Sequence, residues 1–160
     1  MEHRTLDEMS RIATIVPAPN LSRRAVRRQR LNRLADLLST HMGPIRLLTR
    51  IEDVPRVQRR ALRGEFSPLA LAYADVEFRW AGLAGDTIGD AMAFFDLSDN
   101  EVHTLFCDCN YGMSSVQLST IAARVRGVAN RLSARERWEN IRAHFGSKGV
   151  RTWHTTTLTD

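Results

Sequence analysis

Several features are scarce or missing in this chain of 160 residues, and each shortage excludes a class of protein. No apolar run approaches the roughly 18 residues that a membrane-spanning helix needs, which excludes a transmembrane protein. Only two cysteines, Cys107 and Cys109, are present, and they are too few for a disulfide framework. The N-terminal residues lack the continuous apolar segment of a secretory signal. Together these absences predict a reducing, cytoplasmic location and no membrane partner.

Lysine is nearly absent, because Lys148 is the only lysine among 23 basic residues. An arginine excess of this kind accompanies GC-rich coding sequences, so the total positive charge of the chain is a poor indicator of nucleic-acid binding. The distribution is more informative: residues 1–63 carry a net charge of +8, residues 64–110 carry −8 and residues 111–160 carry +5. Such segregation either attracts an acidic partner to the outer thirds or lets the middle pair with the ends inside one fold.

The apolar pattern predicts an all-α protein. A length of 160 residues and a hydrophobic share of 43% fit one globular domain with a real core. Apolar residues recur at spacings of three and four along several segments, which is the period of a helix buried on one face. We predict a single compact domain of about six to eight short-to-medium helices over residues 21–146. A flexible arm (1–20) precedes it, and an extended or disordered tail (147–160) follows.

Helix-start signals and apolar stripes place these helices along the chain. The predicted N-terminal caps and capping boxes are Ser22, Ser67, Asp86, Ser98 with Glu101, Ser114 with Gln117, and Ser133 with Glu136. Two of the predicted buried stripes are Leu31, Leu34, Ala35, Leu38 and Met42, and then Leu69, Ala72, Tyr73, Val76 and Trp80. Residues 45–62 are predicted to hold one or two short helices, with Pro55 in a first turn.

The front of the first helix is unusually basic. Arginines crowd its first turns, where the helix dipole disfavours cations by some tenths of a kcal/mol each. They are Arg23, Arg24, Arg27, Arg28, Arg30 and Arg33. An anionic partner would offset that cost, so nucleic-acid binding through Arg23, Arg24, Arg27, Arg28 and Arg30 is one hypothesis for function. No aromatic residue is interleaved with these arginines, which favours contacts to duplex phosphates over stacking on single strands. The competing interpretation is a solvated basic face.

A second hypothesis is a metal site at His103, Cys107 and Cys109. On a helix His103 and Cys107 lie four residues apart on one face, and Cys109 could return from the following loop. Imidazole and thiolate are donors for zinc or copper, so these residues predict a half-site for either metal, and Asp108 or a water could complete four ligands. In the competing interpretation Cys107 is a small buried core residue and Cys109 an ordinary loop thiol.

The same cysteines allow a thiol-dependent alternative. Asp108-Cys109-Asn110 shortly before a predicted helix resembles the Asp-Cys-Ser segment of papain-like peptidases of the cell-wall hydrolase type. The resemblance implies that Cys109 is a nucleophile and that His144 or His154 acts as its base.

No other catalytic arrangement stands out in the sequence. We therefore expect a small non-enzymatic helical protein that acts by binding a macromolecule, in the first instance another protein. The acidic hairpin over residues 86–108 and the basic face over residues 22–33 are the expected interaction surfaces. Nucleic-acid binding, and a zinc- or thiol-dependent activity at His103, Cys107 and Cys109, remain the alternatives.

Overall fold

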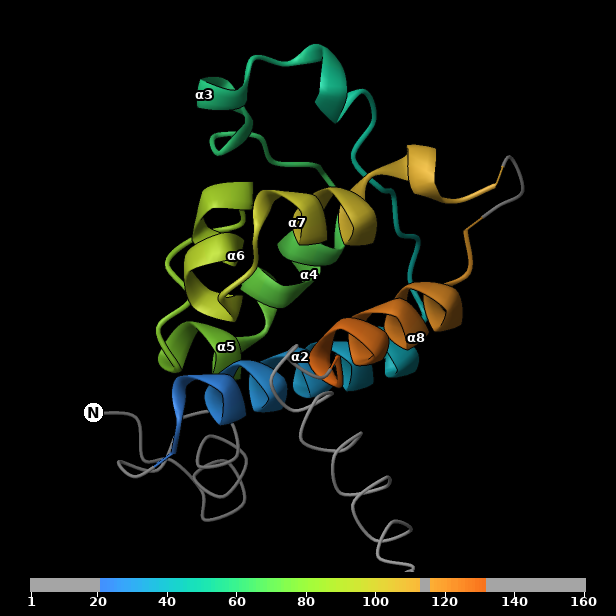
Figure 1. Ribbon diagram of the computed structural model, residues 1–160. Coiled ribbons are helices and arrows are strands. Elements are labelled where there is room, and N and C mark those ends of the chain that lie inside the picture. Colours follow the sequence, from blue (N-terminus) through green and yellow to red (C-terminus); the bar gives the residue numbers. More distant parts are fainter. Residues whose placement is uncertain (1–20, 113–115, 132–160) are drawn as a thin grey trace, which may run out of the picture. The chain divides into compact units, whose positions relative to one another are not determined.

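The computed structural model describes residues 21–112 and 116–131, and this part of the chain is helical (Figure 1). Helices account for 63% of the described residues, which include no strand, so the all-α prediction is confirmed. The α-helices are α2 (Arg23–Thr40), α3 (Arg56–Arg59), α4 (Pro68–Ala74), α5 (Val76–Trp80), α6 (Ile88–Phe95), α7 (Asp99–Phe106) and α8 (Leu118–Ala129). Two 3₁₀ turns, η1 (Ile51–Asp53) and η2 (Asp108–Asn110), complete the described elements. None of these helices combines the length and apolar content that crossing a bilayer requires.

The two longest helices, α2 and α8, pack side by side, and the shorter helices α4 to α7 lie together on one side of this pair (Figure 1). The predicted stripe of α2 is buried over its first four members: Leu31, Leu34, Ala35 and Leu38. Its fifth predicted member, Met42, is 97% exposed, so that part of the prediction is wrong. The helix ends at Thr40 and the extended backbone of His41 turns the next residue away from the core.

The predicted stripe over residues 69–80 is interrupted by a new helix start at Asp75. Its carboxylate accepts hydrogen bonds from the backbone N–H groups of Glu77 (2.9 Å) and Phe78 (3.2 Å). The rotation between α4 and α5 exposes Val76, which the pattern places in the core, and buries Phe78 instead. Tyr73, the other predicted core residue that is exposed, lies in α4 before the break. A side-chain cap within the apolar pattern therefore overrides the periodicity.

Three of the predicted helix caps are confirmed and two are wrong. Ser22, Ser67 and the Ser98 capping box are confirmed. The predicted Asp86 cap is wrong, because Thr87 and Asp90 form a reciprocal capping box one residue later. The Ser114–Gln117 box also fails, since Gln117 is itself the N-cap of α8.

Other predictions concern residues that the structure does not describe. Ser114, the helix predicted from Ser133, the arm over residues 1–20 and the tail over residues 147–160 lie outside the described residues.

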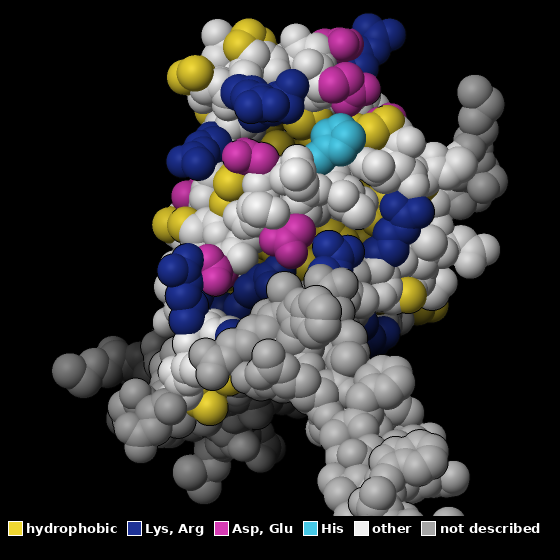
Figure 2. Space-filling model, in the orientation of Figure 1, with side chains coloured by type: hydrophobic (Ala, Val, Ile, Leu, Met, Phe, Trp, Pro, Cys, Tyr) yellow, Lys and Arg dark blue, Asp and Glu magenta, His cyan; other side chains and the backbone are white. Residues whose placement is uncertain are grey.

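Acidic and basic side chains lie next to one another on the face shown in Figure 2. Arg27 pairs with Glu101 at 2.6 Å, Arg33 pairs with Glu77 at 2.7 Å, and Arg23 pairs with Asp96. These pairs join the basic first third of the sequence to its acidic middle. Of the two interpretations of the charge segregation, pairing inside one fold is therefore the one observed over these residues.

Residues 44–64 form what we call the arginine lobe, which contains η1 and α3. Figure 1 shows η1 and α3 on the opposite side of α4 and α7 from α2 and α8. Pro55 is the N-cap of α3 rather than a residue of its first turn. The lobe is held to the helices at two places, where Leu48 bonds to the segment after α7 and where the carbonyls of Arg60 and Leu62 accept from the first residues of α6.

Candidate metal centre

Helix α7 and the turn after it carry three of the four residues of the candidate centre. The Ser98–Glu101 capping box sets the start of α7 and therefore the direction in which His103 points. Helix α7 ends at Phe106, and the extended backbone of Cys107 lets η2 follow at once. That 3₁₀ turn returns Cys109 toward the helix, as the sequence predicts.

The fourth residue, Glu52, comes from the arginine lobe. Leu48 and Cys107 form a parallel β-bridge, in which the Leu48 N–H donates to the Phe106 carbonyl oxygen at 2.9 Å and the Asp108 N–H donates to the Leu48 carbonyl oxygen at 3.0 Å. This bridge brings the turn that follows Leu48, including η1, close to the cysteines.

Arg59 fixes the position of η1. Its guanidinium donates to the carbonyl oxygen of Glu52, in the middle of η1, at 2.9 Å and to that of Val54, immediately after η1, at 2.7 Å. Arg50, immediately before η1, has left-handed backbone with φ 51°, which produces the sharp change of direction there. Glu52 thus reaches the centre from a backbone that Arg59 holds.

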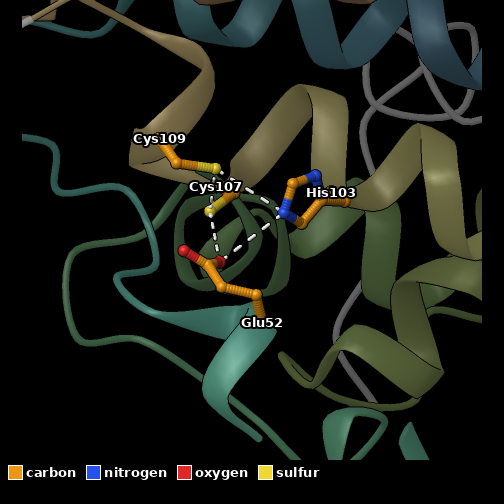
Figure 3. Close-up of side chains that lie close together, drawn as sticks. All are labelled: Glu52, His103, Cys107 and Cys109. Carbon is orange, nitrogen blue, oxygen red and sulfur yellow. Dashed lines mark hydrogen bonds and ion pairs between the residues drawn. The ribbon is translucent and has the colours of Figure 1, made fainter.

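Ligating atoms of Glu52, His103, Cys107 and Cys109 converge to within 4.8 Å of one another (Figure 3). The Nε2 atom of His103 lies 3.5 Å from Cys109 Sγ and 3.6 Å from Glu52 Oε2. The Cys107 Sγ atom lies 3.7 Å from the same Glu52 oxygen and 2.8 Å from Cys109 Sγ. One oxygen, one nitrogen and two sulfurs therefore face a common point.

This donor set fits zinc. Zinc takes four ligands in a tetrahedron, from thiolate, imidazole and carboxylate. With metal–sulfur bonds of about 2.3 Å, two thiolates on one tetrahedral ion stand about 3.8 Å apart. The Sγ atoms of Cys107 and Cys109 would therefore separate by about 1 Å on binding, a movement that the exposed side chain of Cys109 can supply.

A second layer of contacts orients the ligands. The Asn110 amide nitrogen donates to the His103 carbonyl oxygen at 2.8 Å and lies 3.3 Å from His103 Nδ1. The same nitrogen donates to Cys109 Sγ at 3.4 Å. These bonds fix the η2 turn, which carries Cys109, against the last turn of α7, which carries His103.

The pKa values of Cys107 and Glu52 are shifted in opposite directions at the centre. Burial, together with the hydrogen bond to Cys109, raises the pKa of the Cys107 thiol to about 12. The hydrogen bond from its own backbone N–H lowers the pKa of the Glu52 carboxyl, and hydrogen bonds from Cys107 and His103 add to that effect. A divalent cation would remove the penalty on the buried thiolate, because metal-bound thiols are deprotonated.

The structure brings together the three residues predicted from the sequence and adds one that the sequence reasoning missed. Glu52 is separated from His103 by some fifty residues, and no local spacing connects the two. Asp108, the alternative fourth ligand, lies 3.8 Å from Cys107 Sγ but does not belong to the converging group.

The arginines predicted to bind nucleic acid lie along α2, and three of them contact groups inside the fold. Arg23 and Arg27 pair with Asp96 and Glu101, and Arg30 donates to the Phe94 carbonyl at 2.6 Å with its guanidinium 4.1 Å from the Phe94 ring centroid. Of the other two, Arg24 is half-buried and Arg28 is exposed.

The thiol-protease resemblance finds no matching arrangement in the described residues. Cys109 lies inside η2, and the next described helix begins only at Leu118. The proposed bases His144 and His154 lie outside the described residues. No family model, no curated protein and no solved structure matches this chain.

Proposed function

We propose that this protein binds one zinc ion through Glu52, His103, Cys107 and Cys109. The observation that carries the proposal is the convergence of these four donors, from two segments far apart in the sequence, to within 4.8 Å. Clustered acidic side chains alone are common on protein surfaces. Two thiols, an imidazole and a carboxylate aimed at one point are a more specific arrangement.

The role that we propose for this zinc is structural or regulatory rather than catalytic. Four protein donors fill a tetrahedral shell, whereas catalytic zinc keeps one position for water or substrate. The ion would join η1 of the arginine lobe to α7 and so hold the lobe against the helices. This fits a non-enzymatic protein that presents a surface to a macromolecular partner. Zinc-binding thiols also require a reducing compartment, for which we propose the cytoplasm.

Metal analysis of the purified protein tests the proposal directly. After purification without chelator we expect about one zinc per chain, and less than a tenth of that in Cys107→Ser and His103→Ala. The matched control is Asp108→Asn, which removes a neighbouring carboxylate that is outside the converging group and should leave the zinc content unchanged.

Cobalt substitution gives a readout that does not depend on stability. Co²⁺ added to the metal-free protein should produce thiolate-to-cobalt charge-transfer absorption, which Cys107→Ser and Cys109→Ser should each reduce. Glu52→Gln should keep the thiolate bands but alter the d–d spectrum, because it changes one oxygen donor. Metal-free protein without cobalt bands would overturn the proposal, as would equal zinc loss in Asp108→Asn.

A further inference from the structure

Arginines are concentrated in the arginine lobe without carboxylate partners. Residues 44–64 contain six arginines against Glu52 and Asp53, a net charge of +4. The exposed members are Arg46, Arg50, Arg56, Arg60 and Arg63. None of these five forms an ion pair with another residue in the described ranges. Figure 2 shows arginine side chains at the surface of the part of the molecule that carries η1 and α3.

The arginines around α3 stand on a fixed backbone. Arg56, Arg60 and Arg63 recur at spacings of four and three, and the turn continues past α3 through a hydrogen bond from the Leu62 N–H to the Arg59 carbonyl at 3.1 Å. Further bonds from the N–H groups of Ile88 and Gly89 in α6 hold this stretch at 2.9 and 2.8 Å. Arg56, at the start of α3, and Arg60, in the turn after it, therefore lie on a restrained segment of backbone.

A polar cavity of about 510 Å³ opens beside this face. It is lined by Arg56, Arg59, Ser98, Asp99, Asn100 and His103. Guanidinium, hydroxyl and amide groups all donate hydrogen bonds to phosphate oxygens. Asp99 is the one carboxylate in the lining, which also contains the two arginines.

We propose that the arginine lobe binds the phosphate backbone of double-stranded nucleic acid. Protein–nucleic-acid interfaces are polar and strongly positive, whereas the centre of a protein–protein interface is apolar. Val57 is the single large apolar side chain exposed in residues 44–64. The segment contains no aromatic residue, so it offers no platform on which unpaired bases could stack, and duplex is the form that it fits.

This surface differs from the one that the sequence predicts. The guanidinium groups of Arg23, Arg27 and Arg30 on α2 contact carboxylates or a carbonyl of the protein itself. Phosphates would have to compete with those contacts. The lobe arginines meet no such competition from described carboxylates, and the inference does not depend on zinc.

The test compares two variants that each lose two exposed positive charges. Arg56→Ala with Arg60→Ala removes charges from the lobe, and Arg28→Ala with Arg79→Ala removes them elsewhere. Binding to a short fluorescent DNA duplex of mixed sequence is measured by anisotropy between about 50 and 200 mM salt. We expect the lobe variant to bind at least about tenfold more weakly at the low end of that range, with a salt slope lower by about 2. The control should stay within about twofold of the parent protein.

Three results would overturn the inference. The first is the absence of duplex binding by the parent protein at low salt. The second is an equal loss in the lobe and control variants, which would indicate a general charge effect. The third is tighter, lobe-dependent binding of an acidic polypeptide such as polyglutamate, which would identify the partner as an acidic protein. Circular dichroism checks that both variants are folded. We expect them to be, because the substituted side chains are exposed.

Discussion

Helix α2 and the arginine lobe are both rich in arginine, yet they use this residue in opposite ways. On α2 the guanidinium groups of Arg23, Arg27 and Arg33 reach Asp96, Glu101 and Glu77. In the lobe the exposed arginines have no described carboxylate partner, and the half-buried Arg59 bonds to carbonyl oxygens of η1. The difference comes from the surroundings, because α2 packs near the acidic helices and the lobe projects beyond them. Arginine content alone therefore does not locate a binding surface.

The largest expected effect is on α2. Arg33→Ala would leave the carboxylate of Glu77, which is only 8% exposed, without its partner. Removing one member of a buried pair costs about 3 kcal/mol because the other charge stays desolvated. We expect the free energy of unfolding in urea to fall by about that amount.

The matched lobe variant for that experiment is Arg60→Ala, which removes an exposed arginine. A substitution of this kind changes stability by less than about 0.5 kcal/mol. Equal losses of stability in the two variants would show that arginines in the two regions play the same structural role.

Zinc removal should have the next largest effect on stability. It should loosen the attachment of the arginine lobe to α7. A ligand at about 100 times its dissociation constant stabilises the native state by about 2.7 kcal/mol. We expect chelation to lower the thermal midpoint of the parent protein, and Cys107→Ser to be insensitive to it. Affinity should rise with pH, because binding displaces the proton of a thiol whose pKa is raised to about 12. A thermal unfolding midpoint that chelator does not change would argue against zinc joining η1 to α7.

The Arg27–Glu101 pair predicts a smaller, acid-dependent effect. Burial opposes ionisation of Glu101, but hydrogen bonds from Ser98 and the charge of Arg27 outweigh it and lower the pKa of this carboxyl below its usual value of 4.5. Since the folded pKa is depressed, this stabilisation is present above about pH 4.5 and is lost as pH falls through the folded pKa.

Unfolding measured between neutral and acid pH would test the sign of this effect. Glu101→Gln should lose about 1 kcal/mol at neutral pH and show a weaker decline in acid. If Glu101→Gln loses stability in acid as steeply as the parent protein, the acid dependence comes from other carboxylates.

The smallest expected effect is that of zinc on duplex binding by the arginine lobe. If zinc holds η1 against α7, chelation should weaken duplex binding by about threefold, which is roughly 0.6 kcal/mol. Arg56 and His103 line the same cavity, so loss of the ion would loosen one wall of it. Cys109→Ser should reproduce the loss without chelator. Stronger duplex binding after chelation would contradict this coupling.

Local signals were sufficient for a large part of the fold and for most of the site. The Ser98–Glu101 box sets the position of α7, and helical spacing then places His103 and Cys107 on one side. Glu52 was not predictable, because only the Leu48–Cys107 bridge brings it near, and such a pairing leaves no trace in local spacing. The break at Asp75 and the exposure of Met42 were missed because apolar periodicity does not register where a cap ends a helix.

The β-bridge between Leu48 and Cys107 also has a kinetic consequence. It joins residues far apart in the sequence, so its formation requires a long loop to close, and we expect this to occur after the folding transition state. A metal that needs Glu52 together with Cys107 can be captured only after that closure. Interactions absent from the folding transition state slow unfolding without accelerating folding. We therefore expect zinc to lengthen the lifetime of the native state while leaving the refolding rate unchanged.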